Sequence, residues 1–205
     1  MNCRTFASPW GNEDTQHLID ILAKYNVKTT FFVVGDWVDK YPESVKALHD
    51  AGHEVMSHSD HHDHYNSLST SQIVADIQTS CDKIEAVTGS CPTLIRCPYG
   101  EYDDHVISAV RSLGMEPIQW DVDSLDWKDY DADTIYQRVT SRVQPGSIVL
   151  FHNAALHTPE ALPRILEYLI NDGYTVLPIS QLILTGDYTI DHTGRQFAAE
   201  TVSAE

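Results

Sequence analysis

The sequence predicts an α/β protein in which parallel strands alternate with helices. Short runs of β-branched and aromatic residues alternate with amphipathic stretches of about ten to fifteen residues, and about six or seven such units follow one another. The chain has 205 residues, of which 42% are hydrophobic, so it is long enough to bury the core of one medium-sized domain. No repeat, low-complexity tract or linker divides it. We therefore expect one domain built on either a closed barrel or an open sheet.

The strands are expected where β-branched and aromatic residues cluster. These runs lie at residues 3–7, 29–34, 53–56, 93–96, 116–122, 147–151 and 174–177. The last twenty residues are polar and show no pattern. We therefore expect the domain to occupy residues 1–185 and a polar tail to occupy residues 186–205, where it wraps the surface or frays.

The helices are expected between these strands. The first follows an N-cap signal at residues 14–15, and the second opens with Pro42, a residue suited to the first helical turn. Residues 69–88 predict a long helix, because apolar residues recur at steps of three and four and Gly89 can cap the end. Further helices are expected at residues 103–113, 132–143 and 159–171.

Charge and composition exclude several classes of protein. The chain has 13 Lys and Arg against 30 Asp and Glu, a net charge of −17, and is repelled by nucleic acids and anionic membranes. Its apolar runs are far shorter than the roughly 20 residues of a membrane helix, so we expect no membrane span. Residues 1–6 lack the pattern of a secretion signal, which predicts a cytoplasmic location for the chain as written. Four irregularly spaced cysteines favour neither a disulfide framework nor a metal knuckle.

Reactive residue types follow four of the predicted strands. HSDHH at residues 58–62 follows the third strand, RCPYG at 96–100 the fourth, DSLDW at 123–127 the fifth, and His152 the sixth. Active sites of parallel α/β proteins lie at the carboxyl ends of the strands. We therefore expect these four segments to meet in one site.

The histidine-rich segment is a candidate metal site. His58 and His62 are four residues apart, so on a helical turn they face the same way and can bind one divalent metal. The alternative is a hydrophilic loop rich in His and Asp. His61 and His64 are expected to face solvent.

The other segments supply acid–base groups. Arg96, just before a Pro-Tyr-Gly turn, is placed to hold a carboxylate, unless it is an ordinary surface arginine. Asp123 or Asp126 beside His152 would fix the tautomer of that histidine and raise its pKa, unless these aspartates only cap loops. A metal, an oriented histidine acting as general acid and an arginine together indicate metal-assisted hydrolysis of an amide or ester. No glycine-rich phosphate loop or nucleophile elbow competes with this interpretation.

These segments closely resemble the motifs of the polysaccharide deacetylase family, the NodB-homology domains of carbohydrate esterase family 4. HSDHH is similar to HSxxH, RCPYG to RxPYG, DSLDW to DSxDW, and the LFH of residues 150–152 to LxH. The resemblance extends from residue 5 to about residue 184. It implies a single-domain fold, a distorted (β/α) barrel with about seven parallel strands.

The resemblance also implies roles for individual residues. A divalent metal, usually zinc but with cobalt or another divalent ion as alternatives, would polarise an N-acetyl carbonyl. The general acid would protonate the departing amine, a backbone N–H would help to hold the oxyanion, and two apolar side chains would wall an acetyl pocket. The residues implied are His152, Asp126 and Arg96 for catalysis, Tyr99, Trp127 and Leu150 for substrate binding, and His58 and His62 for the metal.

The first family motif is altered. The family has TFDDG, or a variant like FDAAWG, whereas this chain reads TFASPWG, with Ala7 where the family has its catalytic base and Ser8 at a frequent metal-ligand position. Loss of a positioned base costs roughly 10²–10⁴ in rate. Glu13 or Asp14 can replace the carboxylate, zinc hydroxide alone can support slow turnover, or the domain has become a sugar-binding protein. A truncated or altered start is a further alternative, in which case the family's habit implies an extracellular or cell-envelope location.

The expected function is removal of N-acetyl or O-acetyl groups from an amino-sugar polysaccharide, such as peptidoglycan or chitin oligomers. The expected partner is this N-acetylated glycan. One alternative is a non-catalytic carbohydrate-binding pseudoenzyme of the same fold. Another is hydrolysis of a different linear or cyclic amide.

Overall fold

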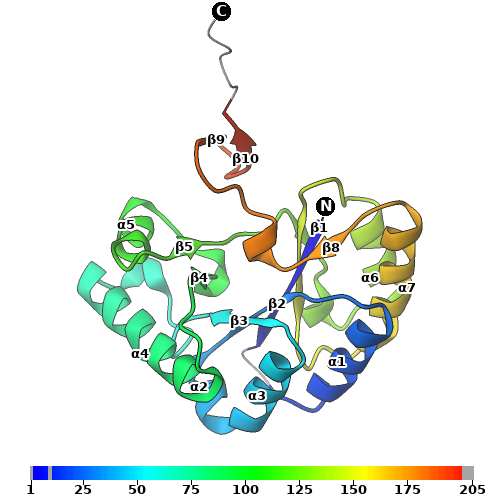
Figure 1. Ribbon diagram of the computed structural model, residues 1–205, viewed down its shortest axis with the longest axis horizontal. Coiled ribbons are helices and arrows are strands. Elements are labelled where there is room, and N and C mark those ends of the chain that lie inside the picture. The colour runs from blue at the N-terminus through cyan, green and yellow to red at the C-terminus, as the bar shows by residue number, and fades with distance from the viewer. Residues whose placement is uncertain (1, 9–10, 200–205) are drawn as a thin grey trace, which may run out of the picture.

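The computed structural model describes residues 2–8 and 11–199, with the backbone alone for residues 2–5 and 8. Within this part of the chain, eight strands form one parallel sheet in the order β5-β4-β3-β2-β1-β7-β6, and β8 pairs with the start of β1. The two outermost strands, β5 and β6, do not pair with each other, so the sheet curls without closing (Figure 1). The predicted α/β class and distorted barrel are confirmed, in the form of a single-domain half-barrel.

The strands and helices lie close to the predicted ranges. The strands of the sheet are β1 (Asn2–Ser8), β2 (Thr30–Val33), β3 (Glu54–Ser57), β4 (Leu94–Ile95), β5 (Glu116–Pro117), β6 (Val122–Asp123), β7 (Ile148–His152) and β8 (Val176–Leu177). The helices are α1 (Thr15–Lys24), α2 (Gly35–Lys40), α3 (Pro42–Asp50), α4 (Thr70–Thr88), α5 (Asp104–Ser112), α6 (Ala132–Thr140) and α7 (Thr158–Asn171).

Local sequence explains the ends of the longest helix, α4. The side chain of Ser69 accepts a hydrogen bond from the backbone N–H of Gln72, and the Gln72 side chain accepts one from the backbone N–H of Ser69. This capping box fixes the start of the helix. Gly89 ends it with φ of 72°, a left-handed conformation that glycine adopts without strain.

The prediction of one strand over residues 116–122 is wrong. Strands β5 and β6 lie on opposite edges of the sheet, and the residues between them cross the open side of the half-barrel. The N–H of Ile118 donates to the carbonyl of Ile95 on β4, next to one edge, and the N–H of Asp121 donates to the carbonyl of Ile148 on β7, next to the other. The β-like residues of this segment therefore bridge two edges instead of forming one strand.

Two further elements differ from the sequence-based expectation. Helix α2 was not expected, because its six residues are too few to show a helical period. The expected patternless tail contains an antiparallel hairpin of β9 (Tyr188–Ile190) and β10 (Gln196–Ala198). The carboxylate of Asp191 accepts backbone N–H bonds from Thr193 and Arg195 and so stabilises the turn. Residues 200–205 lie outside the described residues.

The helices cover the outer face of the sheet. Figure 1 shows α4, α2, α3, α1 and α7 arranged in an arc outside the strands, with the hairpin projecting from the opposite side. None of the helices in the described part of the chain combines the length and the apolar character needed to cross a bilayer.

The main core lies between this outer face and the helices. Phe6 of β1 is the Cα partner of Phe31 on β2 and of Phe151 on β7, and its ring stacks on theirs at centroid distances of 4.7 and 5.7 Å. All three side chains are fully buried. Because side chains alternate along a strand, the next residues, Ala7, Phe32 and His152, point to the inner face.

Replacement of Phe6 by alanine tests this core. We expect Phe6→Ala to lower the free energy of unfolding by about 3–5 kcal/mol, because it removes two ring stacks and leaves a cavity. Urea denaturation measures the change. Phe197→Ala is the matched control, because the side chain of Phe197 on β10 is about half exposed. It is expected to change the free energy of unfolding by less than about 1 kcal/mol. Equal effects of the two substitutions would contradict the described register.

His53, directly before β3, is a buried neutral histidine. Its ring lies edge-on to Phe31 at 5.3 Å, and its Nδ1 accepts the N–H of Thr29. Burial, with a smaller contribution from the charge of Lys28, lowers the pKa of His53 from 6.5 to about 4. Protonation of His53 is therefore disfavoured in the folded state.

This shift predicts a pH dependence of stability. Between pH 6.5 and about 4 the unfolded chain binds more protons at His53 than the folded chain does. The stabilisation from neutral His53 is thus fully present above pH 6.5 and falls by about 3 kcal/mol as the pH is lowered to 4. His53→Asn, which keeps an acceptor for Thr29, is expected to lose less stability over this range. Urea denaturation of both proteins at pH 7 and at pH 4.5 measures the loss of stability. An equal loss in wild type and in His53→Asn would show that His53 does not cause this pH dependence.

Candidate active site at the carboxyl edge of the sheet

The carboxyl ends of β3, β4 and β7 bring the predicted residues to one edge. Ser57 and Ile95 are Cα partners on β3 and β4, and Ser57 faces outward, where its Oγ lies 2.9 Å from Ser80 of α4. By alternation the following residues, His58 and Arg96, point to the inner face. This is also the face that carries Ala7 and His152.

His152 is held by a buried carboxylate. Asp126 is fully buried, and its Oδ1 lies 2.8 Å from Nδ1 of His152. Its Oδ2 accepts the backbone N–H of His152 at 2.8 Å and the hydroxyl of Thr158 at 2.7 Å. Because Nδ1 donates to the carboxylate, Nε2 is the nitrogen that can exchange a proton with a ligand. Thr158 was not predicted from the sequence, since nothing local distinguishes it from an ordinary first-turn residue.

His58 and His62 lie side by side. The Nδ1 of His58 is 2.7 Å from the carbonyl oxygen of Arg96, and the two imidazole centroids are 4.8 Å apart. Burial lowers the pKa of both, and the mutual repulsion of charged imidazoles lowers that of His58 further. Neutral histidines, one of them fixed through Nδ1 by a backbone carbonyl, are the form in which imidazole binds metal.

Tyr99 packs against this histidine pair. Its backbone has φ of 57°, and its half-exposed ring lies 4.6 Å from His62 and 4.0 Å from His64, onto which it stacks. Glu101 accepts from Nδ1 of His64 at 2.7 Å. The side chain of His64 faces solvent, as expected, but it also supports one side of Tyr99.

Arg96 is buried instead of lying on the surface. Its guanidinium carbon lies 4.5 Å from the ring of Phe32 and 5.4 Å from that of Trp120, and Nη2 donates to the carbonyl of Gln119. The contact with Trp120 was missed because residues 118–121 were assigned to a strand. Gly100 leaves room for this ring, since a Cβ there would lie 2.6 Å from Trp120.

Ala7 occupies the position beside His152 where the resemblance implies a base. Its Cα partners are His152 and Phe32, and its methyl group is buried. The side chain of Ser8, the other altered position, lies outside the described residues. Ala7 therefore presents a methyl group, and not a carboxylate, on the inner face.

The described residues fit two protein ligands of a divalent metal. Burial favours the neutral form of His58 and His62, their rings are adjacent, and Nδ1 of His58 contacts the carbonyl of Arg96. Within residues 2–8 and 11–199, no group of three His, Cys, Asp or Glu side chains is arranged to hold a metal ion.

Of the acidic side chains that reach this region, that of Asp14 is the nearest in sequence to the altered motif. Its Oδ2 accepts the N–H of Ala154 at 2.9 Å, two residues after His152. Burial raises the pKa of Asp14, the bond from Ala154 opposes this rise, and the charges of Glu13 and Asp126 add to it. Glu13 itself is exposed. Of the two acidic residues considered from the sequence, Asp14 is the one that contacts the end of the β7 segment.

The two predicted pocket residues occupy different settings. Leu150 is buried on β7 and points to the same inner face as His152. Trp127 lies in the short 3₁₀ helix Asp126–Lys128, about half exposed, with Nζ of Lys128 5.0 Å from its ring. The structure thus places Leu150 inside the half-barrel and Trp127 at its rim.

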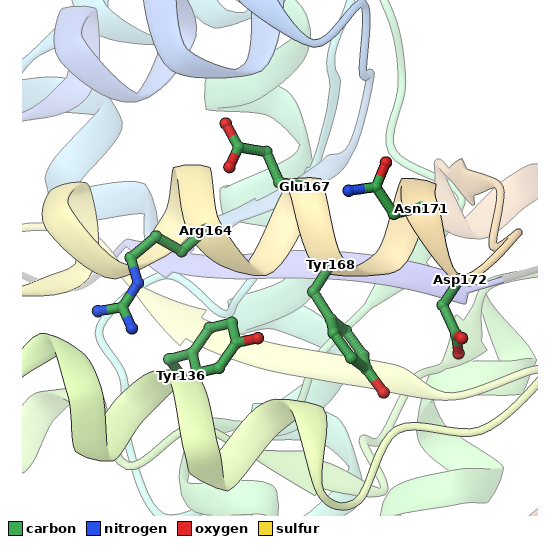
Figure 2. A pocket seen from close by; sticks show the side chains of 6 residues that line it. All are labelled: Tyr136, Arg164, Glu167, Tyr168, Asn171 and Asp172. Carbon is green, nitrogen blue, oxygen red and sulfur yellow. The ribbon is translucent and has the colours of Figure 1, made fainter.

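A separate groove runs between α6 and α7 on the outer surface (Figure 2). Two of its charged side chains are engaged with neighbours: Arg164 pairs with Asp133, and Glu167 accepts from the hydroxyl of Tyr25. It contains none of the residues predicted for the site.

A parallel half-barrel with paired imidazoles and a carboxylate-held histidine at its carboxyl edge has the architecture of carbohydrate esterase family 4. The family model described as polysaccharide deacetylase matches residues 4–118, more than half of the chain. The chain belongs to this family.

Curated relatives include two bacterial peptidoglycan deacetylases. Peptidoglycan-N-acetylmuramic acid deacetylase PdaC of Bacillus subtilis is 36% identical over 168 residues, which are 82% of this chain and 35% of PdaC. Peptidoglycan-N-acetylglucosamine deacetylase PgdA of Listeria monocytogenes is 34% identical over 178 residues, 87% of this chain and 38% of PgdA. The chain therefore spans little more than a third of the length of these two relatives.

Solved structures of the family superpose closely. Wild-type BA3943 of Bacillus anthracis, described as a CE4 family pseudoenzyme, matches with a TM-score of 0.86 and 36% identity over 89% of this chain and 64% of that chain. A BA3943 mutant described as having restored enzymatic activity gives the same TM-score and identity, over 89% of this chain and 66% of that chain. The family 4 carbohydrate esterase of Streptomyces lividans, in complex with acetate, matches with a TM-score of 0.79 and 31% identity over 97% of both chains.

Proposed function

We propose that this chain is a metal-dependent deacetylase of N-acetylated or O-acetylated amino-sugar polysaccharides whose turnover is slowed by Ala7. The observation that carries the proposal is the buried Asp126 carboxylate bound to Nδ1 of His152, beside the neutral pair His58 and His62. Peptidoglycan is the substrate class that the names of the relatives PdaC and PgdA favour.

His152 serves as the general acid in this proposal. Asp126 fixes its ring and stabilises the imidazolium form, so Nε2 can deliver a proton to the amine that leaves the acetyl group. Thr158 and the backbone N–H of His152 hold the second oxygen of Asp126, which prevents the carboxylate from rotating away. These contacts depend on none of the altered residues of the first motif.

His58 and His62 would hold the metal, for which zinc is the proposed ion. When bound, such an ion supplies Lewis-acid polarisation of the acetyl carbonyl. The backbone N–H of Tyr99 is the proposed oxyanion donor, positioned by the left-handed backbone of its turn. Leu150 and Trp127 are the proposed walls of the acetyl pocket.

The step that this chain performs poorly is removal of a proton from the attacking water. Ala7 has no group that accepts a proton, although it lies beside His152 on the inner face. Asp14 is the proposed substitute for any residual activity, because its carboxylate reaches the residues after His152 and burial raises its pKa toward the working range of a base.

Restoring the carboxylate is the direct test. We expect Ala7→Asp to increase acetate release from N-acetylglucosamine oligomers or peptidoglycan by roughly 10²–10⁴-fold in the zinc-loaded protein. Ala7→Asn is the matched control, because it has the same shape without a basic oxygen and is expected to give no increase. Asp14→Asn should abolish the residual activity of the wild type if Asp14 is the substitute base. Activity of Ala7→Asp no higher than that of Ala7→Asn would refute the role of this position.

A non-catalytic carbohydrate-binding protein is the second candidate. Ala7 itself favours it, together with the similarity to BA3943, described as a pseudoenzyme whose mutant has restored activity. Elemental analysis of the wild type and of His58→Ala, combined with glycan-binding and acetate-release assays, separates the two. About one zinc per chain and slow acetate release, both lost in His58→Ala, support the deacetylase. Glycan binding with no acetate release supports the binding protein.

A further inference from the structure

The loop that carries His62 holds two strained backbone positions. Ser59 has φ of 74° and His62 has φ of 60°, a left-handed region that non-glycine residues rarely occupy. Such conformations persist only where the surrounding structure enforces them. The contacts around residues 59–62 therefore decide whether His62 stays beside His58.

Helix α2 supports the loop from one side. The N–H of Gly35 donates to the carbonyl of Ser59, and the N–H of Asp36 donates to the carbonyl of Asp60, both at 3.0 Å. The fit is tight, since a Cβ on Gly35 would lie 1.9 Å from Oδ1 of Asp60. The loop is thus seated directly on the first turn of α2.

Helix α4 supports the loop from the other side. The carboxylate of Asp76 accepts the N–H of Asp60 at 3.1 and 3.2 Å, and the hydroxyl of Tyr65 also donates to it at 2.5 Å. Asp60 is therefore fixed through its backbone by both helices.

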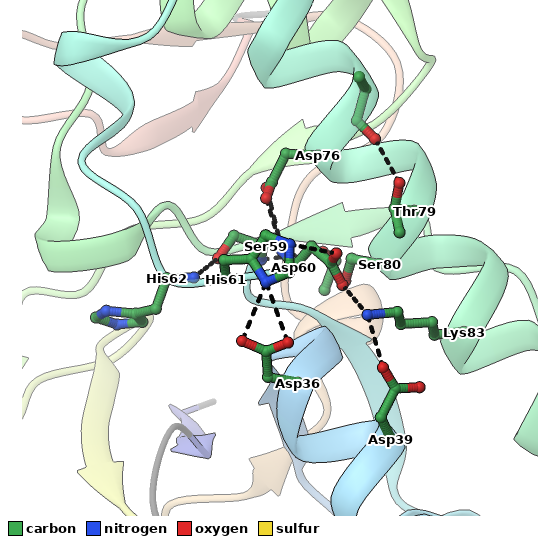
Figure 3. A network of polar contacts seen from close by, with 12 residues as sticks. Asp36, Asp39, Ser59, Asp60, His61, His62, Asp76, Thr79, Ser80 and Lys83 are labelled. Carbon is green, nitrogen blue, oxygen red and sulfur yellow. Dashed lines mark hydrogen bonds and ion pairs between the residues drawn. The ribbon is translucent and has the colours of Figure 1, made fainter.

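The side chain of Asp60 is a buried charge. Only 4% of it is exposed, and it forms ion pairs with Nζ of Lys83 at 2.7 Å and with Nε2 of His61 at 3.1 Å. Lys83, on α4, also pairs with Asp39 of α2 at 2.8 Å, so it links the two supporting helices across the loop (Figure 3). Among the labelled side chains of Figure 3, Lys83 is the only permanent cation.

We propose that Lys83 is a positioning residue for the metal ligands: by neutralising buried Asp60 it holds residues 59–62 in the conformation that sets His62 against His58. The proposal rests on the metal site of the proposed function. Lys83 has no other part in the proposed chemistry of that site, since its Nζ pairs with Asp60 of the loop and with Asp39 of α2.

Removing the charge of Lys83 has a definite consequence. Asp60 would keep its ion pair with His61, which also contacts Asp36. It would lose the full charge of Lys83, which offsets the carboxylates of Asp60 and Asp39, and a buried carboxylate near other carboxylates is strongly unfavourable. Moving the loop outward into water relieves this cost. That movement also separates His62 from His58 and weakens metal binding.

The test compares Lys83→Met with Lys46→Met. Lys46 is the matched control, because its ion pair with Asp50 lies on α3 with both side chains 56% exposed. Zinc affinity is measured by competition with a chelator. We expect Lys83→Met to bind zinc about 10–100-fold more weakly and Lys46→Met to bind it as the wild type does. Lys83→Met combined with Asp60→Asn removes the uncompensated charge and is expected to recover most of the affinity.

A second measurement needs no metal. The rings of His58, His62 and Tyr99 lie close enough for inter-ring NOEs in the metal-free protein, and we expect Lys83→Met to lose them and Lys46→Met to keep them. If Lys83→Met does not fold, Lys83→Gln, which keeps hydrogen-bond donors without the charge, carries both comparisons.

The outcomes separate this proposal from the proposed function. A wild type that binds no zinc but shows the expected NOE changes refutes the metal site and leaves the positioning role standing. Wild-type zinc affinity and unchanged NOEs in the Lys83 variants overturn the positioning role.

Discussion

The site depends on the register of β1 between β2 and β7. Because side chains alternate along a strand, stacking Phe6 with Phe31 and Phe151 on the outer face forces Ala7, Phe32 and His152 onto the inner face. A slip by one residue would reverse both faces at once. The aromatic core and the chemical groups are therefore positioned by the same pairing, and the core cannot form without also placing His152 beside Ala7.

The two histidine sites are each oriented by groups outside the altered first motif. A backbone carbonyl, that of Arg96, fixes His58, and the buried carboxylate of Asp126 fixes His152. Pairing of β3 with β4 fixes the position of the Arg96 carbonyl. Hydrogen bonds from the N–H of His152 on β7 and the hydroxyl of Thr158 on α7 fix the position of the Asp126 carboxylate. The groups that orient both histidines in these contacts thus lie outside the altered first motif.

The features that follow from the order of the strands could be predicted from the sequence. The contacts that form when elements distant in the sequence pack together could not. Motifs such as HSDHH and His152 were found because parallel strands present their carboxyl ends on one edge. The split of residues 116–122 into β5 and β6 was not foreseen, since strand composition does not reveal that the half-barrel stays open. Lys83 gave no signal either, because it reads as an ordinary polar residue of an amphipathic helix. Its partner Asp60 becomes a buried charge only when α2 and α4 close on the loop.

Arg96 is a buried cation that aromatic rings and a backbone carbonyl stabilise. A buried guanidinium is costly to remove from water unless neighbouring groups compensate for the lost solvation. Here the rings of Phe32 and Trp120 lie 4.5 and 5.4 Å from its guanidinium carbon, and the carbonyl of Gln119 accepts from it, so cation–π attraction and a hydrogen bond offset the loss of solvation. Trp120 reaches this position because its segment crosses the open side of the half-barrel. These two rings and this carbonyl lie outside the first motif, and they stabilise the guanidinium of Arg96 on the inner face.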